Sequence, residues 1–152
     1  MLNRRRIAYA FLAVFALLAG GFGFLYVALA PFAQRDADAR AAFGPIASLQ
    51  PEILDNAFGV YIVRFTPDSF LTDRNVSQLL SLNRIPNDSD LTLMIETQSV
   101  TDESVTVIRQ LTSVDRLHLN RTSISADGIA LLVSSLPDCT LSFSATDAAD
   151  GG

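Results

Sequence analysis

The chain contains no lysine and no tryptophan, and it has one cysteine and one histidine among its 152 residues. A single cysteine, Cys139, excludes an intrachain disulfide, so packing alone must hold the fold together. A single histidine, His118, leaves one candidate base for serine or cysteine hydrolysis. Neither a Gly-x-Ser-x-Gly elbow nor a cysteine-protease signature accompanies it. We therefore predict a solvated surface histidine and a protein that is not an enzyme.

Motifs for metal and phosphate binding are also missing. The acidic stretch 87–90 lacks the alternating oxygen ligands and the distal glutamate of a calcium loop, which favours a polar turn. The only glycine-rich stretch, 20–23, lies inside an apolar run and does not follow a strand. We expect neither a metal ion nor a cofactor.

Because lysine is absent, positive charge comes from arginine alone, and it is unevenly distributed. Residues 33–152 carry all sixteen acidic residues but only eight of the eleven arginines. Such an acidic region repels phosphate backbones, which makes a nucleic-acid partner unfavourable.

Residues 7–30 are uncharged and follow three consecutive arginines, Arg4, Arg5 and Arg6. As a helix they would span roughly 36 Å, against about 30 Å for a bilayer hydrocarbon core. The pattern predicts a single-pass signal anchor over 7–32. Since positive flanks stay inside, residues 1–6 would be cytoplasmic and the C-terminal domain extracytoplasmic, in a bacterial envelope.

A cleaved signal peptide is the alternative, with Ala28-Leu29-Ala30 as a small-x-small cleavage site. The apolar run is much longer than the usual core of about 7–15 residues, which favours retention. Two small-residue pairs, Ala16/Gly20 and Ala19/Gly23, leave a homo-oligomer through the membrane helix open.

After this run, residues 33–59 are expected to form a connector or N-terminal cap, and residues 145–152 a disordered tail. Between them, short stretches alternate apolar and other residues with the period of a strand: 61–65, 91–95, 117–120 and 140–143. Apolar residues between these stretches recur at gaps of three and four, as on one helix face. Each of these helices follows a polar start that can supply a cap: Thr72-Asp73, Thr101-Asp102 and Ser125-Ala126-Asp127, with Ser99, Thr122 and Ser123 as alternatives.

The strands align as a repeat. Phe65, Ile95, Leu119 and Phe143 coincide when the strand ends are placed in register, 30, 24 and 24 residues apart. The next apolar anchors, Leu71, Val100 and Ile124, then coincide as well.

The best copy, residues 117–132, resembles the strand–turn–helix unit of the leucine-rich repeat family. A second copy, 93–108, is fainter, and a third, 63–79, is fainter still and longer. The resemblance covers roughly residues 60–144 and implies an α/β stack of parallel strands and helices behind the transmembrane helix. The alternatives are a small α+β domain with βαβ units of similar length, and an external domain that is disordered or folds only with a partner.

In that family the strand residues between the core positions commonly bind proteins, so the resemblance implies a partner-binding face here. The expected face consists of Arg64, Met94, His118, Ser142, Thr66, Glu96 and Asn120. We therefore expect a membrane-anchored, non-enzymatic module for protein–protein interaction. A structural or assembly subunit of a membrane complex, or a relic of a longer repeat protein, is the alternative.

Overall fold

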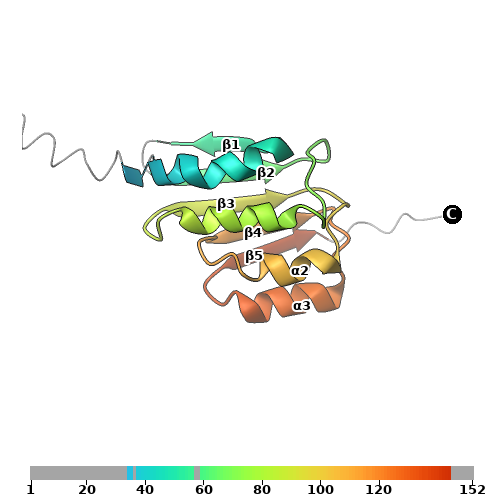
Figure 1. Ribbon diagram of the computed structural model, residues 1–152. Coiled ribbons are helices and arrows are strands. Elements are labelled where there is room, and N and C mark those ends of the chain that lie inside the picture. Colours follow the sequence, from blue (N-terminus) through green and yellow to red (C-terminus); the bar gives the residue numbers. More distant parts are fainter. Residues whose placement is uncertain (1–33, 36, 57–58, 145–152) are drawn as a thin grey trace, which may run out of the picture. The chain divides into compact units, whose positions relative to one another are not determined.

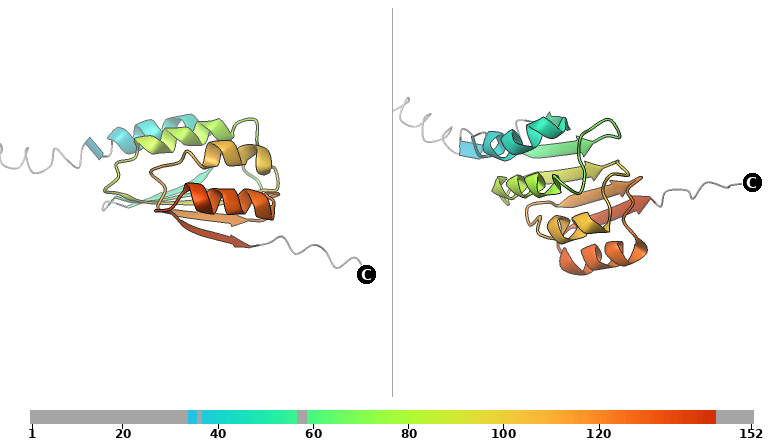
Figure 2. Two further views of the ribbon diagram at one scale, coloured as in Figure 1. Left: turned by 90° about the horizontal axis from the view of Figure 1, so that it is seen from below. Right: turned by 45° about the vertical axis from the view of Figure 1, so that its right-hand side comes forward.

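The computed structural model describes residues 34–35, 37–56 and 59–144. The chain divides into two compact units, Met1–Asp36 and Ala37–Gly152, and the elements below belong to the second. This unit has two layers, with its helices on one face of a five-stranded sheet (Figures 1 and 2). Among the described residues, no helix lies on the other face of the sheet (Figure 2).

The sheet is mixed, and its strands are arranged in sequence order. They are β1 (Glu52–Asp55), β2 (Val60–Phe65), β3 (Asp90–Ile95), β4 (Arg116–Asn120) and β5 (Thr140–Ser144). The pairs β2–β3, β3–β4 and β4–β5 are parallel, whereas β1 lies antiparallel to β2. Residues 57–58, between β1 and β2, lie outside the described part.

The predicted register of the four parallel strands is confirmed. Phe65 pairs with Ile95, Ile95 with Leu119, and Leu119 with Phe143. The first three side chains are at most 1% exposed, as are those two positions earlier: Val63, Leu93 and Leu117. The alternation seen in the sequence therefore separates a buried face from an open face on each of β2, β3 and β4.

Three helical segments follow β2, β3 and β4: the 3-10 helix η2 (Val76–Arg84), α2 (Asp102–Ile108) and α3 (Ala126–Ser135). Two of the three expected caps form: Thr101 accepts from Glu103 N–H and Ser125 from Gly128 N–H, whereas no side chain of the described residues caps the start of η2. In η2, Val76, Leu79 and Leu82 are buried at intervals of three. This spacing matches the three residues per turn of a 3-10 helix.

An additional helix, over residues 37–46, covers the sheet near β1 and β2, and it continues into the 3-10 turn η1 (Ala47–Leu49). Gly44-Pro45 disfavours a helix locally, yet the helix continues through both residues. Proline cannot donate to the carbonyl four residues earlier. Arg84 Nη1 instead contacts that Ala41 carbonyl at 3.5 Å, and the Ser81 hydroxyl donates to the Ala42 carbonyl at 2.6 Å.

Two aspartates near the starts of helical segments connect successive units. The carboxylate of Asp73 accepts from the backbone N–H of Thr101 at 2.9 Å and from the hydroxyls of Thr101 and Ser104. In the next unit, Asp102 accepts from the Ser125 N–H at 2.8 Å. Each of these aspartates thus holds the start of the following helix.

Gly128 permits the second of these contacts. A Cβ at this position would clash with the Asp102 carboxylate and lie 2.8 Å from Ile124 Cγ2. A glycine is required at position 128 because Asp102 of the preceding unit approaches the helix closely. This steric requirement outweighs the low helix propensity of glycine.

Two parts of the predicted fold class require correction. The prediction of a sheet with parallel strands only is wrong, because the antiparallel strand β1 makes the sheet mixed. The membrane prediction is overturned as well: within 34–35, 37–56 and 59–144, no helix is long and apolar enough to cross a membrane. The predicted span itself, 7–32, falls outside the described residues, and the single-pass localisation that depended on it is corrected with it.

Candidate functional site

The face of the sheet without helices carries the candidate site, which we call the open face. Its central row consists of Arg64, Met94, His118 and Ser142, whose Cα atoms pair from strand to strand. Glu52 on β1 extends the row, because it pairs with Arg64. The structure therefore brings four of the seven predicted binding residues into one line across β2 to β5.

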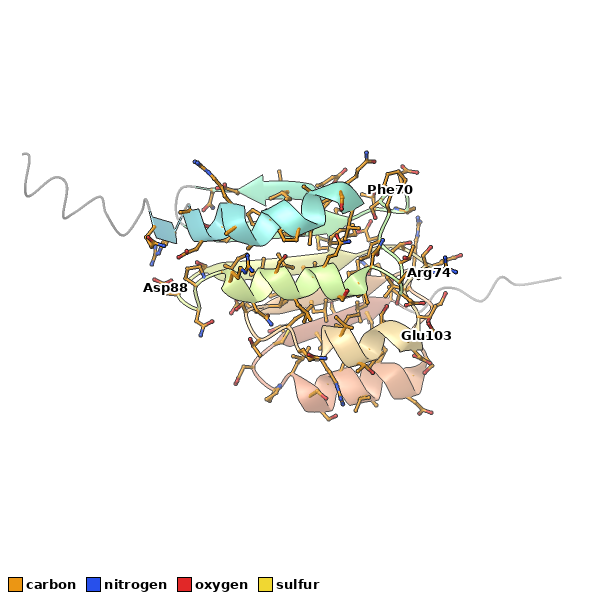
Figure 3. The ribbon with its side chains drawn as sticks, in the orientation of Figure 1. Phe70, Arg74, Asp88 and Glu103 are labelled. Atoms are coloured by element: carbon orange, nitrogen blue, oxygen red, sulfur yellow. The ribbon has the colours of Figure 1, made fainter. Side chains whose placement is uncertain are left out.

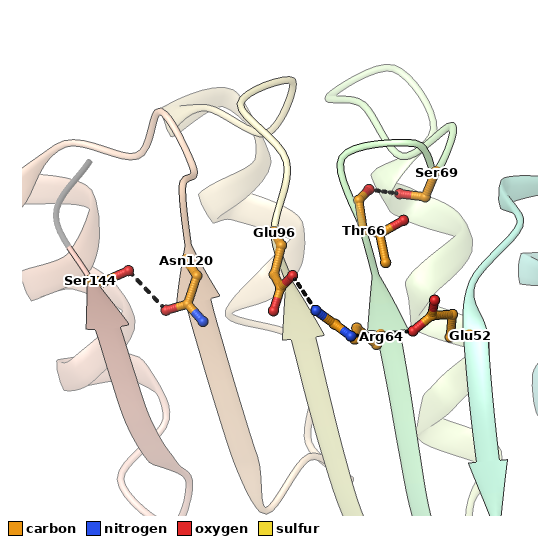
Figure 4. Close-up of polar contacts among 7 residues, drawn as sticks. All are labelled: Glu52, Arg64, Thr66, Ser69, Glu96, Asn120 and Ser144. Atoms are coloured by element: carbon orange, nitrogen blue, oxygen red, sulfur yellow. Dashed lines mark hydrogen bonds and ion pairs between the residues drawn. The ribbon is translucent and has the colours of Figure 1, made fainter. Parts of the chain in front are cut away.

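An arginine between two glutamates organises one side of the open face. Arg64 Nη2 lies 2.8 Å from Glu96 Oε2, and its Nη1 lies 3.4 Å from Glu52 Oε2 (Figure 4). The hydrogen bond to Glu96, and then its negative charge, raise the pKa of the Arg64 guanidinium above its ordinary value. The three groups span β1, β2 and the end of β3, so the cation is held in one orientation.

A second arginine is paired on the same face. Arg116 on β4 forms an ion pair with Asp90 at the start of β3 and contacts the Thr92 hydroxyl at 3.4 Å. At the other end of β4, Asn120 Oδ1 accepts from the Ser144 hydroxyl at 3.0 Å (Figure 4). Neighbouring strands thus match their polar side chains across the sheet.

Thr66 holds a position equivalent to that of Glu96, because each directly follows the last residue of its strand. It follows the last residue of β2, and its backbone carbonyl accepts from the Ser69 hydroxyl at 2.6 Å (Figure 4). Its role visible in the structure is to close the turn after β2.

His118 is hydrogen-bonded to the Ser142 hydroxyl through Nδ1. A serine beside a histidine is the first requirement of a hydrolase nucleophile, but a triad also needs a group that orients the histidine. Among the described residues, no carboxylate contacts His118, and neither His118 nor Ser142 lines one of the pockets described below. The pair fits a cross-strand polar contact better than a catalytic one.

Comparison with known proteins does not assign the chain. No family model, no curated protein and no solved structure matches it. The resemblance to leucine-rich repeats accordingly gains no support and stays a prediction.

A shallow pocket lies at the carboxyl ends of the parallel strands, beside the open face. Its volume is about 290 Å³, and it is lined by Pro67, Glu96, Thr97, Gln98, Ser99 and Arg121. Loops at this end of the sheet are a common ligand-binding position in α/β folds. Figure 3 shows Phe70, Arg74 and Glu103 at this same end of the molecule and Asp88 at the opposite end.

Arg121 in this pocket was missed by sequence reasoning. Its backbone is left-handed, with φ at 55°, and its side chain is exposed. A left-handed arginine is uncommon, because its Cβ crowds the backbone. The available sequence signal was its place directly after the last residue of β4, at the strand end where binding groups gather.

Cys139 is a poor candidate for chemistry. It is half-buried, packs against the core, lines a small pocket together with Leu136, and carries no disulfide. Burial, together with the negative charge of Asp115, raises the pKa of its thiol. The nucleophilic thiolate is thereby disfavoured.

Proposed function

We propose that this chain is a non-enzymatic protein-binding module that contacts its partner through the open face. The observation that supports this proposal is the row of paired side chains on parallel strands whose other face is buried. Arg64, Glu96 and His118 are fixed by hydrogen bonds before any partner arrives. Such preorganisation lowers the entropy lost on binding.

The composition of the open face also favours a protein partner. Ile62 and Met94 give the middle of the face apolar atoms, and Leu54 on β1 is 65% exposed. Charged side chains surround them, as polar residues surround the apolar centre of many interfaces. The acidic surplus of residues 33–152 argues against nucleic acid as the partner.

The test is an affinity capture with the full-length chain and two variants matched in charge. Arg64→Ala/Glu96→Ala removes one arginine and one glutamate from the open face. Arg109→Ala/Glu103→Ala removes the same two residue types from exposed positions at α2, on the helical side. Both variants keep the net charge of the native chain.

We expect a partner that is retained by the native chain and by the α2 variant. Loss of two fixed contacts should weaken capture by the open-face variant about tenfold or more, which corresponds to about 1.4 kcal/mol. Equal capture by all three proteins would overturn the proposal. Loss with the α2 variant alone would move the binding surface to the helices.

A further inference from the structure

The two edges of the sheet differ in the features that control strand pairing. Strand β1, at one edge, is Glu-Ile-Leu-Asp and carries two negative charges in four residues. Strand β5, at the other edge, is Thr-Leu-Ser-Phe-Ser and carries none. Edge strands are usually protected from pairing with other chains by charge, proline, bulges or a cover.

Strand β5 has none of these protections among the described residues. It is the last strand of the sheet, it contains no proline, and Phe143, next to its central residue, is 57% exposed. The neighbouring helix α3 contains one charged residue, Asp127, and exposes Leu131 and Val133. The β5 edge is therefore an uncharged, partly apolar border on an acidic domain.

The charge distribution indicates that a second copy of this chain can pair with the β5 edge. Two copies of an acidic chain repel each other over most of their surface, and contact costs least where neither copy carries charge. A β1 edge brought against another β1 edge would place Glu52 and Asp55 opposite like charges. The β5 edge avoids that repulsion.

The sequence of β5 also complements itself. In an antiparallel pair centred on Ser142, Thr140 lies opposite Ser144, and Leu141 lies opposite Phe143 of the second copy. Leu141 and Phe143 both point to the helical face, because they pair with the buried Leu117 and Leu119. Apolar side chains thus meet apolar ones, and the small polar residues meet on the open face.

From these observations we infer that two copies of this chain pair through β5, antiparallel and centred on Ser142. The pairing joins two five-stranded sheets into one continuous sheet and places two open faces side by side. Such a contact is symmetric and closes as a dimer.

The contact is small, which predicts a dissociable dimer. Strand β5 has 5 residues and α3 has 10, and only part of α3 is exposed. Stable interfaces use about 20–30 residues on each side. The dimer should therefore form at high concentration and dissociate on dilution.

Site-directed cross-linking of the full-length chain tests this inference. Residues opposite each other in an antiparallel pair have Cβ atoms about 4.5–5.5 Å apart, close to the distance that a disulfide bridges. Ser142→Cys, in a Cys139→Ser background, should therefore form a disulfide-linked dimer under mild oxidation. Leu54→Cys in the same background is the matched control, because it is exposed on the opposite edge strand.

We expect the Ser142→Cys dimer at several times the yield of the Leu54→Cys dimer, falling as the protein is diluted. Adding Phe143→Lys, which places a charge on β5, should lower that yield severalfold without changing the circular dichroism spectrum. Equal yields at the two edges, or no cross-link, would overturn the inference. A dominant mixed cross-link between the two cysteine variants would replace it with head-to-tail pairing of β5 and β1.

Discussion

The two faces of the sheet place adjacent residues of the same strands in opposite environments. Val63 is fully buried, whereas the side chain of its neighbour Arg64 is 43% exposed and held by two carboxylates. The helical face is filled by aliphatic and aromatic side chains, whereas the open face carries matched polar pairs around a few apolar side chains such as Ile62 and Met94. This difference indicates that the helical face supplies most of the buried core, while the proposed binding depends on the open face.

The largest expected effect on stability comes from truncating a buried side chain on the helical face of the sheet. Phe65→Ala removes a fully buried ring and should lower the free energy of unfolding by about 3–5 kcal/mol. Chemical denaturation of the full-length chain measures the loss. The control is Met94→Ala on the open face, which should cost clearly less, and an equal cost for the two variants would contradict the division between the faces.

An intermediate effect is expected where one unit of the helical layer joins the next. Asp73→Ala leaves Thr101 and Ser104 without their acceptor and should cost about 1–3 kcal/mol at neutral pH. Burial opposes ionisation of Asp73, but the hydrogen bonds from Ser104 and Thr101 outweigh it and lower the pKa of the carboxyl. The native contact is therefore complete above the unfolded pKa of about 3.9 and is lost as the pH falls through the lower folded value.

Denaturation at pH 7 and at decreasing pH should consequently show the native protein and Asp73→Ala converging in acid. Asp68→Ala, at an exposed position in the turn after β2, is the control and should change stability by less than about 0.5 kcal/mol. A gap between native and Asp73→Ala that does not depend on pH would refute the role assigned to the carboxylate.

The smallest effect is expected for the histidine–serine pair on the open face. His118→Ala and Ser142→Ala each remove one partly exposed hydrogen bond and should cost no more than about 1 kcal/mol. Neither change should alter ester hydrolysis by the full-length chain, measured with a p-nitrophenyl ester. A saturable activity of the native chain that both variants abolish would show that this pair is catalytic.

The parallel strands and their register could be predicted because each strand repeats the same alternation at a constant offset. Thr101 and Ser125 were among the predicted cap candidates, since a helix start leaves N–H groups that a side-chain oxygen can satisfy, but the sequence did not distinguish them from neighbouring polar residues. The helix over 37–46 could not be predicted from the sequence, because Gly44-Pro45 disfavours a helix locally. Contacts from Ser81 and Arg84, about forty residues away, compensate for it.

The candidate site was predicted in part. The central row follows from alternation alone, once the strands are placed in register. The ion pairs of this row do not follow from alternation, because Glu52 lies on a strand that was predicted as part of a connector or cap. Arg121 was missed for a related reason: its left-handed backbone is a property of the folded turn.

By itself, the sequence determined which residues are buried and where most strands lie, because hydrophobic periodicity is a local property of the chain. It also determined that no intrachain disulfide holds the fold. The tertiary structure decided that β1 runs antiparallel, that Arg64 is held between two glutamates, and that β5 is left as an uncharged edge. These features depend on contacts between segments far apart in the chain, whose geometry no local pattern specifies.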